Sequence, residues 1–214
     1  SARMVINGNY LFVRTCHEMY NGHQANVTFS VDTSNMNIVD KFTGIWNTSN
    51  GYVSHSFNQF IQVDNGTLLG VDHGEGYPTA LVLSKYVSDI SSGNFQSVIS
   101  TPCKSLTFMS LVNDTSIHYN YTGASLGAFE YSDSAYLIAG TKDTDSTATT
   151  RDVFITSMDK SSGETFTHFY SNYAGTDDSA LTPHLVKTGN NSFILLWSNQ
   201  GYVYYTAVDG TGQQ

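Results

Sequence analysis

A pattern of turn, apolar strand and partner strand occurs four times along this chain of 214 residues. Each occurrence opens with a cluster of turn-forming residues, and the four clusters are residues 7–9, 64–66, 132–134 and 189–191. Asn, Asp and Gly tolerate the positive φ that tight hairpin turns require, so each cluster indicates a β-hairpin. Recurrence at roughly 55 to 70 residues predicts stacked or radially arranged antiparallel sheets, because one such sheet cannot bury its apolar face alone.

The partner strands divide the chain into four repeats within what we expect to be a single domain. We place the repeats at about residues 1–45, 52–100, 122–173 and 180–214. Residues 105–121 are less regular, and they indicate either an outer strand pair or part of an extra short blade. No segment shows sustained apolar periodicity of 3.6 residues, so helices should be negligible.

Two of the repeats resemble those of secreted microbial β-propeller proteins, whose blades pass from a short inner strand through a turn to an apolar strand. The resemblance rests on residues 58–83 and 183–210. It implies an all-β fold: a β-propeller of four or five antiparallel blades, or an excised part of a larger propeller. The similarity is architectural, since the chain has no WD dipeptide, no kelch Gly-Gly pair and no Asp-box, and no family's functional residues are carried over.

The charge of the chain argues against two classes of partner. The formal net charge is −9, and the nine Lys and Arg residues are scattered singly. No basic stripe is present to neutralise phosphates, so we expect neither nucleic acid nor an anionic membrane as a partner. No apolar run approaches the length of about 20 residues that spans a bilayer, and we expect no membrane insertion.

Cys16 and Cys103 are the only cysteines. They indicate either one long-range disulfide in an exported protein or two buried thiols. The chain is acidic and rich in Asn, Ser and Thr, and it carries sequons such as those at Asn26, Asn65 and Asn190. We therefore expect a secreted or cell-surface protein, compatible with glycosylation. Because no charged or apolar leader opens the chain, we expect a mature or excised piece of a longer protein.

The best candidate site lies in two equivalent loops, at residues 16–24 of the first repeat and 72–78 of the second. Adjacent blades would bring these loops to one face. Tyrosine rings stack on sugar C–H surfaces, while carboxylates and imidazoles satisfy hydroxyl groups, so this mixture suits carbohydrate. The alternative is that these side chains hydrogen-bond between blades. The candidate ligand-binding residues are His17, Glu18, Tyr20, His23, Asp72, His73, Glu75 and Tyr77.

Hydrolysis of a polysaccharide is an alternative use of the same loops. A glycosidase places two carboxylates about 5 to 9.5 Å apart across the scissile bond. Glu18, Asp72 and Glu75 are the candidates here, with Asp152 a more distant one. Acidic residues near turns are more often caps or solvated groups, and the chain has no Gly-x-Ser-x-Gly nucleophile elbow. We therefore expect no catalytic residues in the leading interpretation.

We expect neither a metal nor a cofactor. The segment with Asp143 and Asp145 has the spacing of a partial calcium loop but lacks the downstream glutamate. His168 and His184 each stand alone, as packing histidines usually do. No CxxC or paired His/Cys spacing indicates zinc. Of the two tryptophans, Trp197 ends an apolar strand and should pack in a core, whereas Trp46 lies in a predicted loop.

These observations support three interpretations. The leading one is a propeller that binds carbohydrate, a surface glycan or a protein partner without catalysis. The second is a propeller-type glycoside hydrolase or lyase. The third is a structural or adhesive protein that self-associates through an apolar patch.

Overall fold

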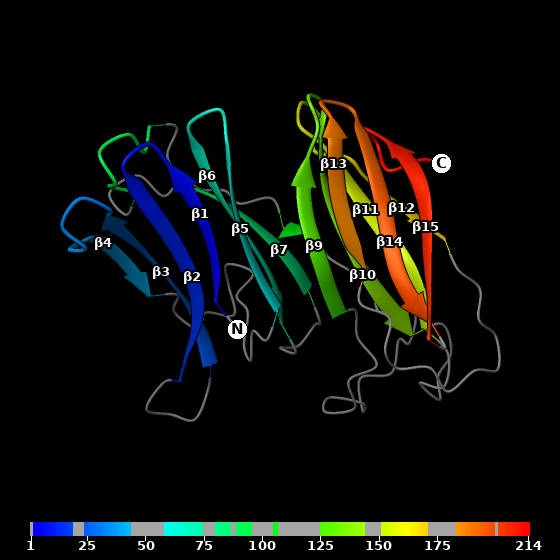
Figure 1. Ribbon diagram of the computed structural model, residues 1–214, viewed down its shortest axis with the longest axis horizontal. Helices are drawn as coiled ribbons and strands as arrows, with labels where there is room; N and C mark the ends of the chain where they lie inside the picture. Colours follow the sequence, from blue (N-terminus) through cyan, green and yellow to red (C-terminus); the bar gives the residue numbers. More distant parts are fainter. Residues whose placement is uncertain are drawn as a thin grey trace. The chain divides into compact units, whose positions relative to one another are not determined.

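The structure is a computed structural model that describes residues 2–18, 24–43, 58–74, 80–86, 89–95, 105–106, 125–143, 151–170, 183–199 and 201–214. Every regular element in these ranges is a β-strand, and the strands form four antiparallel sheets (Figure 1). The predicted all-β class built from antiparallel meanders is therefore confirmed. No membrane-spanning helix occurs in the described part of the chain.

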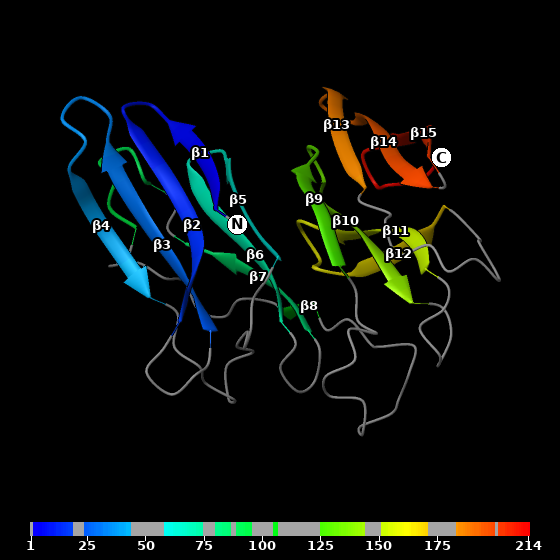
Figure 2. The same cartoon turned by 60° about the horizontal axis from the view of Figure 1, so that its bottom comes forward.

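The chain divides into two compact units, of which unit 1 comprises residues 1–108. Its two sheets are meanders, since strands that follow each other in sequence are also neighbours in the sheet (Figure 2). The first sheet has the order β1 (Arg3–Asn7), β2 (Tyr10–Glu18), β3 (Gln24–Asp32), β4 (Ile38–Thr43). The second has the order β5 (Asn58–Asp64), β6 (Thr67–Gly74), β7 (Ala80–Lys85), β8 (Ser105–Leu106).

Unit 2 comprises residues 109–214 and also holds two meander sheets. The first consists of β9 (Ser125–Tyr131), β10 (Ala135–Asp143), β11 (Arg151–Asp159) and β12 (Thr165–Phe169). The second consists of β13 (His184–Gly189), β14 (Ser192–Asn199) and β15 (Tyr202–Asp209). Among the described residues, this last sheet has three strands where the others have four.

All four predicted turn clusters connect paired strands. The β5–β6 turn shows the expected chemistry most clearly, because Asn65 and Gly66 both have positive φ, at 47° and 74°. Two such residues in a two-residue loop match the twist of the flanking strands. Gly8 supplies a φ of 58° in the β1–β2 turn. Local residue chemistry therefore sets the hairpins that begin the sheets.

The strands run further than the sequence predicts at the ends that carry the candidate site. The β2–β3 ladder continues through Cys16, His17 and Glu18, which pair with residues 26, 25 and 24. Likewise β6 continues through Asp72 and His73. The expectation that these residues lie in loops is wrong, because backbone pairing with the next strand outweighs the polar character of the side chains. Strand β8 lies beyond the predicted end of the second repeat.

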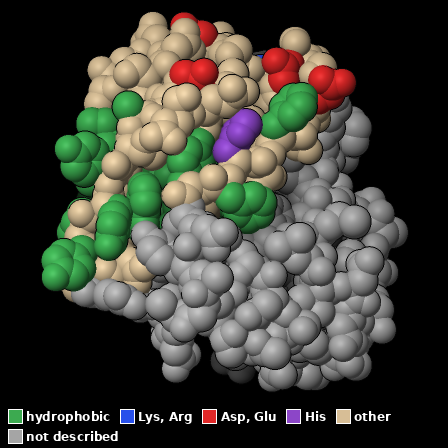
Figure 3. Space-filling view, turned by 90° about the vertical axis from the view of Figure 1, so that its right-hand side faces the viewer, with side chains coloured by type: hydrophobic (Ala, Val, Ile, Leu, Met, Phe, Trp, Pro, Cys, Tyr) green, Lys and Arg blue, Asp and Glu red, His purple; other side chains and the backbone are tan. Residues whose placement is uncertain are grey.

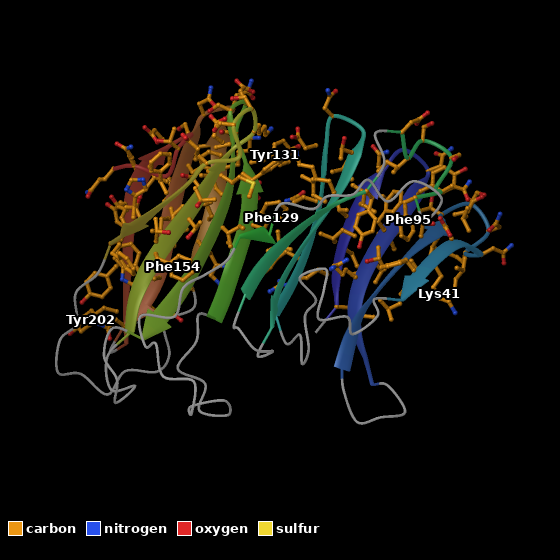
Figure 4. All side chains as sticks on the ribbon, turned by 180° about the vertical axis from the view of Figure 1, so that it is seen from behind. Lys41, Phe95, Phe129, Tyr131, Phe154 and Tyr202 are labelled. Atoms are coloured by element: carbon orange, nitrogen blue, oxygen red, sulfur yellow. The ribbon has the colours of Figure 1, made fainter. Side chains whose placement is uncertain are left out.

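The core of unit 1 lies between its two sheets. Phe12 of β2 and Leu68 of β6 are both fully buried in one cluster, together with Phe95 from the segment after β7. The Phe95 ring meets Phe12 and Tyr86 edge to face, at centroid distances of 6.1 and 5.5 Å (Figure 4). Edge-to-face pairs of this kind add to the stabilisation from buried area.

The core of unit 2 joins its two sheets in the same manner. Leu137 and Ile155 pack with Phe193, Leu195 and Trp197 of β14. Trp197 is 7% exposed and stacks on Tyr204 at 5.9 Å between ring centroids, so the predicted core role of this residue is confirmed. Trp46 lies outside the described residues.

A glycine bulge allows β13 to approach β9. The register between β9 and β10 shifts between Ala139 and Gly140, so Gly127 has no partner. A Cβ at Gly127 would lie 2.7 Å from Cδ of Pro183, immediately before β13. A glycine at a bulge marks such close approach of backbone.

Candidate functional site

The structure places the backbone of four of the predicted site residues. His17 and Glu18 are the last two residues of β2, and Asp72 and His73 lie near the end of β6. The others, Tyr20, His23, Glu75 and Tyr77, lie outside the described residues, as does Cys103. The pairing of Cys16 with Cys103 and the convergence of the eight site side chains therefore stay predictions.

The ends of β2 and β6 lie at one end of unit 1. Strands β1 and β2 both contact β5, the partner of β6. The Arg3 guanidinium stands over the Phe60 ring, with Cζ 4.4 Å from the centroid, and Val5 packs against the cluster that contains Ile61. Figure 1 shows that β1 and β5 run in the same direction, and so do their antiparallel partners β2 and β6. The predicted residues follow both strands away from the two hairpin turns.

A buried arginine connects β2 with the second sheet. Arg14 is fully buried, and its Nη1 donates hydrogen bonds to Thr28 Oγ1 at 2.6 Å and to Tyr86 Oη at 2.7 Å. A buried cation must be hydrogen-bonded, because the loss of hydration is otherwise very costly. These two hydroxyl groups, one on β3 and one just after β7, hold the guanidinium between the sheets.

Gly70 of β6 makes room for that guanidinium. A Cβ at this position would lie 2.8 Å from both Cζ and Nη1 of Arg14. A real Cβ atom does not approach a non-bonded heavy atom this closely, so residue 70 must lack a side chain for Arg14 to occupy its position. The contact therefore fixes the level at which β2 meets β6.

The sequence reasoning missed Arg14 and Gly70. The available signal was an isolated cation within the apolar strand Tyr10–Glu18 and an isolated glycine within the apolar strand Thr67–Gly74. An isolated glycine in a strand often marks close approach of another group. The sequence around Gly70 cannot show which group approaches it, because Arg14 belongs to another sheet.

Other polar groups of unusual environment lie in unit 2. The Nε2 of His168 and the hydroxyl of Tyr170 are buried without a hydrogen-bond partner, as is Oδ1 of Asn199. Burial, with the nearby negative charge of Asp209, raises the pKa of Tyr170 to about 12. His168 is half-buried and His184 is exposed. No group of three potential metal ligands occurs within the described ranges.

Two lysines surround Tyr131 near the β9–β10 turn. Lys187 Nζ donates to the Tyr131 carbonyl at 2.8 Å and lies 4.1 Å from the ring centroid, while Lys160 Nζ lies 5.0 Å from it (Figure 4). Burial raises the pKa of the adjacent Glu130, and the charge of Lys187 opposes that shift. These contacts join strands and turns of unit 2, so Lys160 and Lys187 have a structural role there.

Comparisons with known proteins find similarity to solved structures alone. No family model and no curated protein matches the chain. Ten solved chains match it in structure. One of them is the native arabinanase Arb43A of Bacillus subtilis, which is 19% identical with a TM-score of 0.47, over 96% of this chain and 70% of that one.

Proposed function

We propose that this chain is a carbohydrate-active protein that binds a polysaccharide at the end of unit 1 where β2 and β6 finish, and hydrolyses it with Glu18 and Asp72. The observation that carries the proposal is the common direction of β2 and β6, which takes both carboxylate-bearing positions to the same end of the unit. Hydrolysis is preferred to binding alone because glycosidases use two carboxylates that flank the scissile bond, and this end of unit 1 carries two carboxylate-bearing positions.

The spacing along the strands supports this pair. Glu18 lies four residues beyond Arg14 on β2, and Asp72 lies two residues beyond Gly70 on β6. Both positions therefore lie beyond the Arg14–Gly70 contact, in the direction in which β2 and β6 run.

Neighbouring residues would supply recognition. The segments after β2 and β6 carry Tyr20 and Tyr77, whose rings suit stacking against a sugar. His17 and His73 offer nitrogen donors or acceptors to sugar hydroxyls. In the proposed site the carboxylates act on the glycosidic bond, and the tyrosines and histidines orient the sugar.

The test is an assay for reducing ends released from a panel of arabinan, xylan, galactan, β-glucan and starch. We expect the wild-type chain to act on one of these, and E18Q and D72N each to lower the rate by at least about 100-fold, since removal of one carboxylate removes a catalytic group. The matched control is E164Q, which makes the same change at the exposed turn before β12. Circular dichroism is used to check that all variants are folded.

A second candidate function is binding without catalysis, favoured by the tyrosines that follow each of the two strands. It predicts retention on one insoluble polysaccharide, no release of reducing ends, and loss of retention in Tyr20→Ala or Tyr77→Ala. Retention without release would replace the hydrolase proposal by this one. A folded chain that neither binds nor cleaves any member of the panel contradicts both.

A further inference from the structure

Both carboxyl residues of the proposed reaction have a glutamine directly opposite them in the sheet. Glu18 pairs with Gln24 between β2 and β3, and Asp72 pairs with Gln59 between β5 and β6. We propose that Gln24 and Gln59 are positioning residues, each of which hydrogen-bonds through its amide to the carboxyl group opposite it. This role rests on the hydrolysis proposed above and adds two residues to the same site.

The contact between Arg14 and Gly70 shows which faces of the two sheets look toward each other. The guanidinium Cζ lies 2.8 Å from the place of a Cβ on Gly70, so the face of β2 that carries Arg14 is turned toward the face of β6 that carries Gly70. Successive residues of a strand alternate between the two faces. Position 18 on β2 and position 72 on β6 therefore belong to these facing surfaces.

The glutamine positions belong to the same two surfaces. Residues directly opposite each other in an antiparallel pair share a face, with Cβ atoms about 4.5–5.5 Å apart. A glutamine side chain is long enough to bring its amide to a carboxyl group across that distance. Only seven of the 214 residues are glutamine, and two of them take these positions in different sheets.

The facing surfaces change from apolar to polar at the level of Arg14. Phe12 lies two residues before Arg14 and Leu68 two residues before Gly70, and both are fully buried in one cluster. Beyond that level the same faces carry the two carboxyl positions and their glutamines. An apolar core would continue with apolar residues, whereas a row of amide and carboxyl groups suits a site for a polar ligand.

Glutamine fits the chemistry that a glycosidase asks of a carboxyl neighbour. The amide has two N–H donors and one oxygen acceptor, so it can donate to a carboxylate and accept from a carboxylic acid. The carboxyl groups of a glycosidase pass between these two states during the reaction. A lysine would favour the ionised state and a second carboxylate would favour the neutral one. A neutral amide holds the carboxyl group in both states and takes no proton from it.

The test that needs no substrate follows the side-chain resonances of the labelled full chain by NMR. In the wild type, the side-chain amide protons of Gln24 should shift with pH at the pKa of Glu18, and those of Gln59 at the pKa of Asp72. Gln62 is the internal control, because it pairs with Leu69 on the alternate face of β5. Amide protons of Gln24 and Gln59 that ignore the titration of the carboxyl groups overturn the proposal.

Variants should give a crossed pattern of pKa changes. Methionine keeps the length of glutamine and lacks the amide, and a hydrogen bond to either protonation state shifts the pKa of a carboxyl group. Q24M should therefore change the pKa of Glu18 by at least about 0.5 and that of Asp72 by less than about 0.2. Q59M should do the reverse. Q62M makes the same replacement on β5 and should leave both pKa values within about 0.2 of wild type.

Kinetics separate positioning from sugar binding. On the polysaccharide that the chain cleaves, Q24M and Q59M should lower kcat at least about tenfold, because a misaligned carboxyl group no longer meets the glycosidic bond. KM should change less than about twofold, since the amides hold the carboxyl groups and not the sugar. One limb of the pH profile should move with the pKa of the opposite carboxyl group. A rise in KM alone overturns the positioning role.

A control variant removes exposed rings from unit 2. Tyr202 and Tyr205 of β15 are 69% and 74% exposed. Figure 3 views unit 2 from its β15 side and shows hydrophobic side chains gathered there. Exposed rings can stack on sugars, so Y202A/Y205A tests whether KM belongs to unit 1. We expect this variant to change kcat and KM less than about twofold.

The two proposals fail in different ways. Release of reducing ends by the wild type, with both pKa values unchanged in Q24M and Q59M, overturns the positioning role and leaves the hydrolysis. The crossed pattern of pKa changes in a chain that cleaves no polysaccharide overturns the hydrolysis and leaves the two hydrogen-bonded pairs. Circular dichroism checks that each variant is folded, and the wild-type amide titration requires no variant.

Discussion

The guanidinium of Arg14 occupies the space that a side chain at residue 70 would need, with 2.8 Å between Arg14 Cζ and the position of a Cβ on Gly70. This contact joins the middle of β2 to the middle of β6. It makes the spacing of two sheets depend on the absence of one methyl group. The predictions that follow begin with this pair.

Gly70→Ala should destabilise unit 1 by about 1–3 kcal/mol, because the new methyl group displaces a buried guanidinium from its hydrogen bonds. At an unconstrained strand position the same change stabilises by roughly 0.5–1 kcal/mol. Gly189→Ala is the control, since its Cβ would meet nothing nearer than Ser192 Cβ at 3.6 Å. Urea unfolding measures both. Equal effects of the two substitutions would show that Arg14 does not constrain residue 70.

Tyr86→Phe should cost about 1.5–3 kcal/mol, the range for a hydrogen bond to a charged group, because Arg14 loses one acceptor. The ring contacts with Phe95 and Phe42 stay, so packing changes little. Tyr205→Phe removes the same hydroxyl from a residue that is 74% exposed, and it should change stability by less than about 0.5 kcal/mol. The free energy of unfolding from denaturant titration compares them.

Asp159 should contribute to the acid sensitivity of unit 2. The hydroxyl and amide donors of Ser161 and Ser162 lower the pKa of Asp159 to about 2. A folded-state pKa below the unfolded value of about 3.9 gives stability that is present above pH 4 and lost as the pH falls toward 2. The difference in urea midpoint between wild type and D159N should therefore narrow between pH 4 and 2. A difference that is constant from pH 6 to 2 contradicts this assignment.

Ser132→Ala should destabilise unit 2 by about 1–3 kcal/mol, because it leaves buried backbone groups without partners. Ser132 is 1% exposed, donates to Gly210 O at 2.7 Å and accepts from Ala135 N at 2.9 Å. These bonds connect the β9–β10 turn to the end of β15. Ser134→Ala changes an exposed serine of the same turn and should have little effect on the thermal midpoint. Comparable losses in the two variants would contradict a specific role for Ser132.

The hairpins could be predicted from sequence because their causes are local. Asn65 and Gly66 adopt a positive φ, which asparagine tolerates and which glycine permits because it has no Cβ, and the apolar residues on either side pair as expected. The ends of the strands at the candidate site could not be predicted in this way. His17 and Glu18 look like loop residues, yet the β2–β3 ladder includes them, since pairing with β3 satisfies their backbone groups.

The amino-acid sequence by itself determined the class of fold and the places where the chain reverses, because turn preference and alternating side chains act over a few residues. The tertiary structure decided which faces meet. Arg14 donates a hydrogen bond to Tyr86 although the two residues are 72 positions apart in sequence. The space for the Arg14 guanidinium depends on Gly70, which lies on yet another strand. Such contacts depend on how separate sheets pack, and that packing is set by the summed burial of many side chains that no short segment contains.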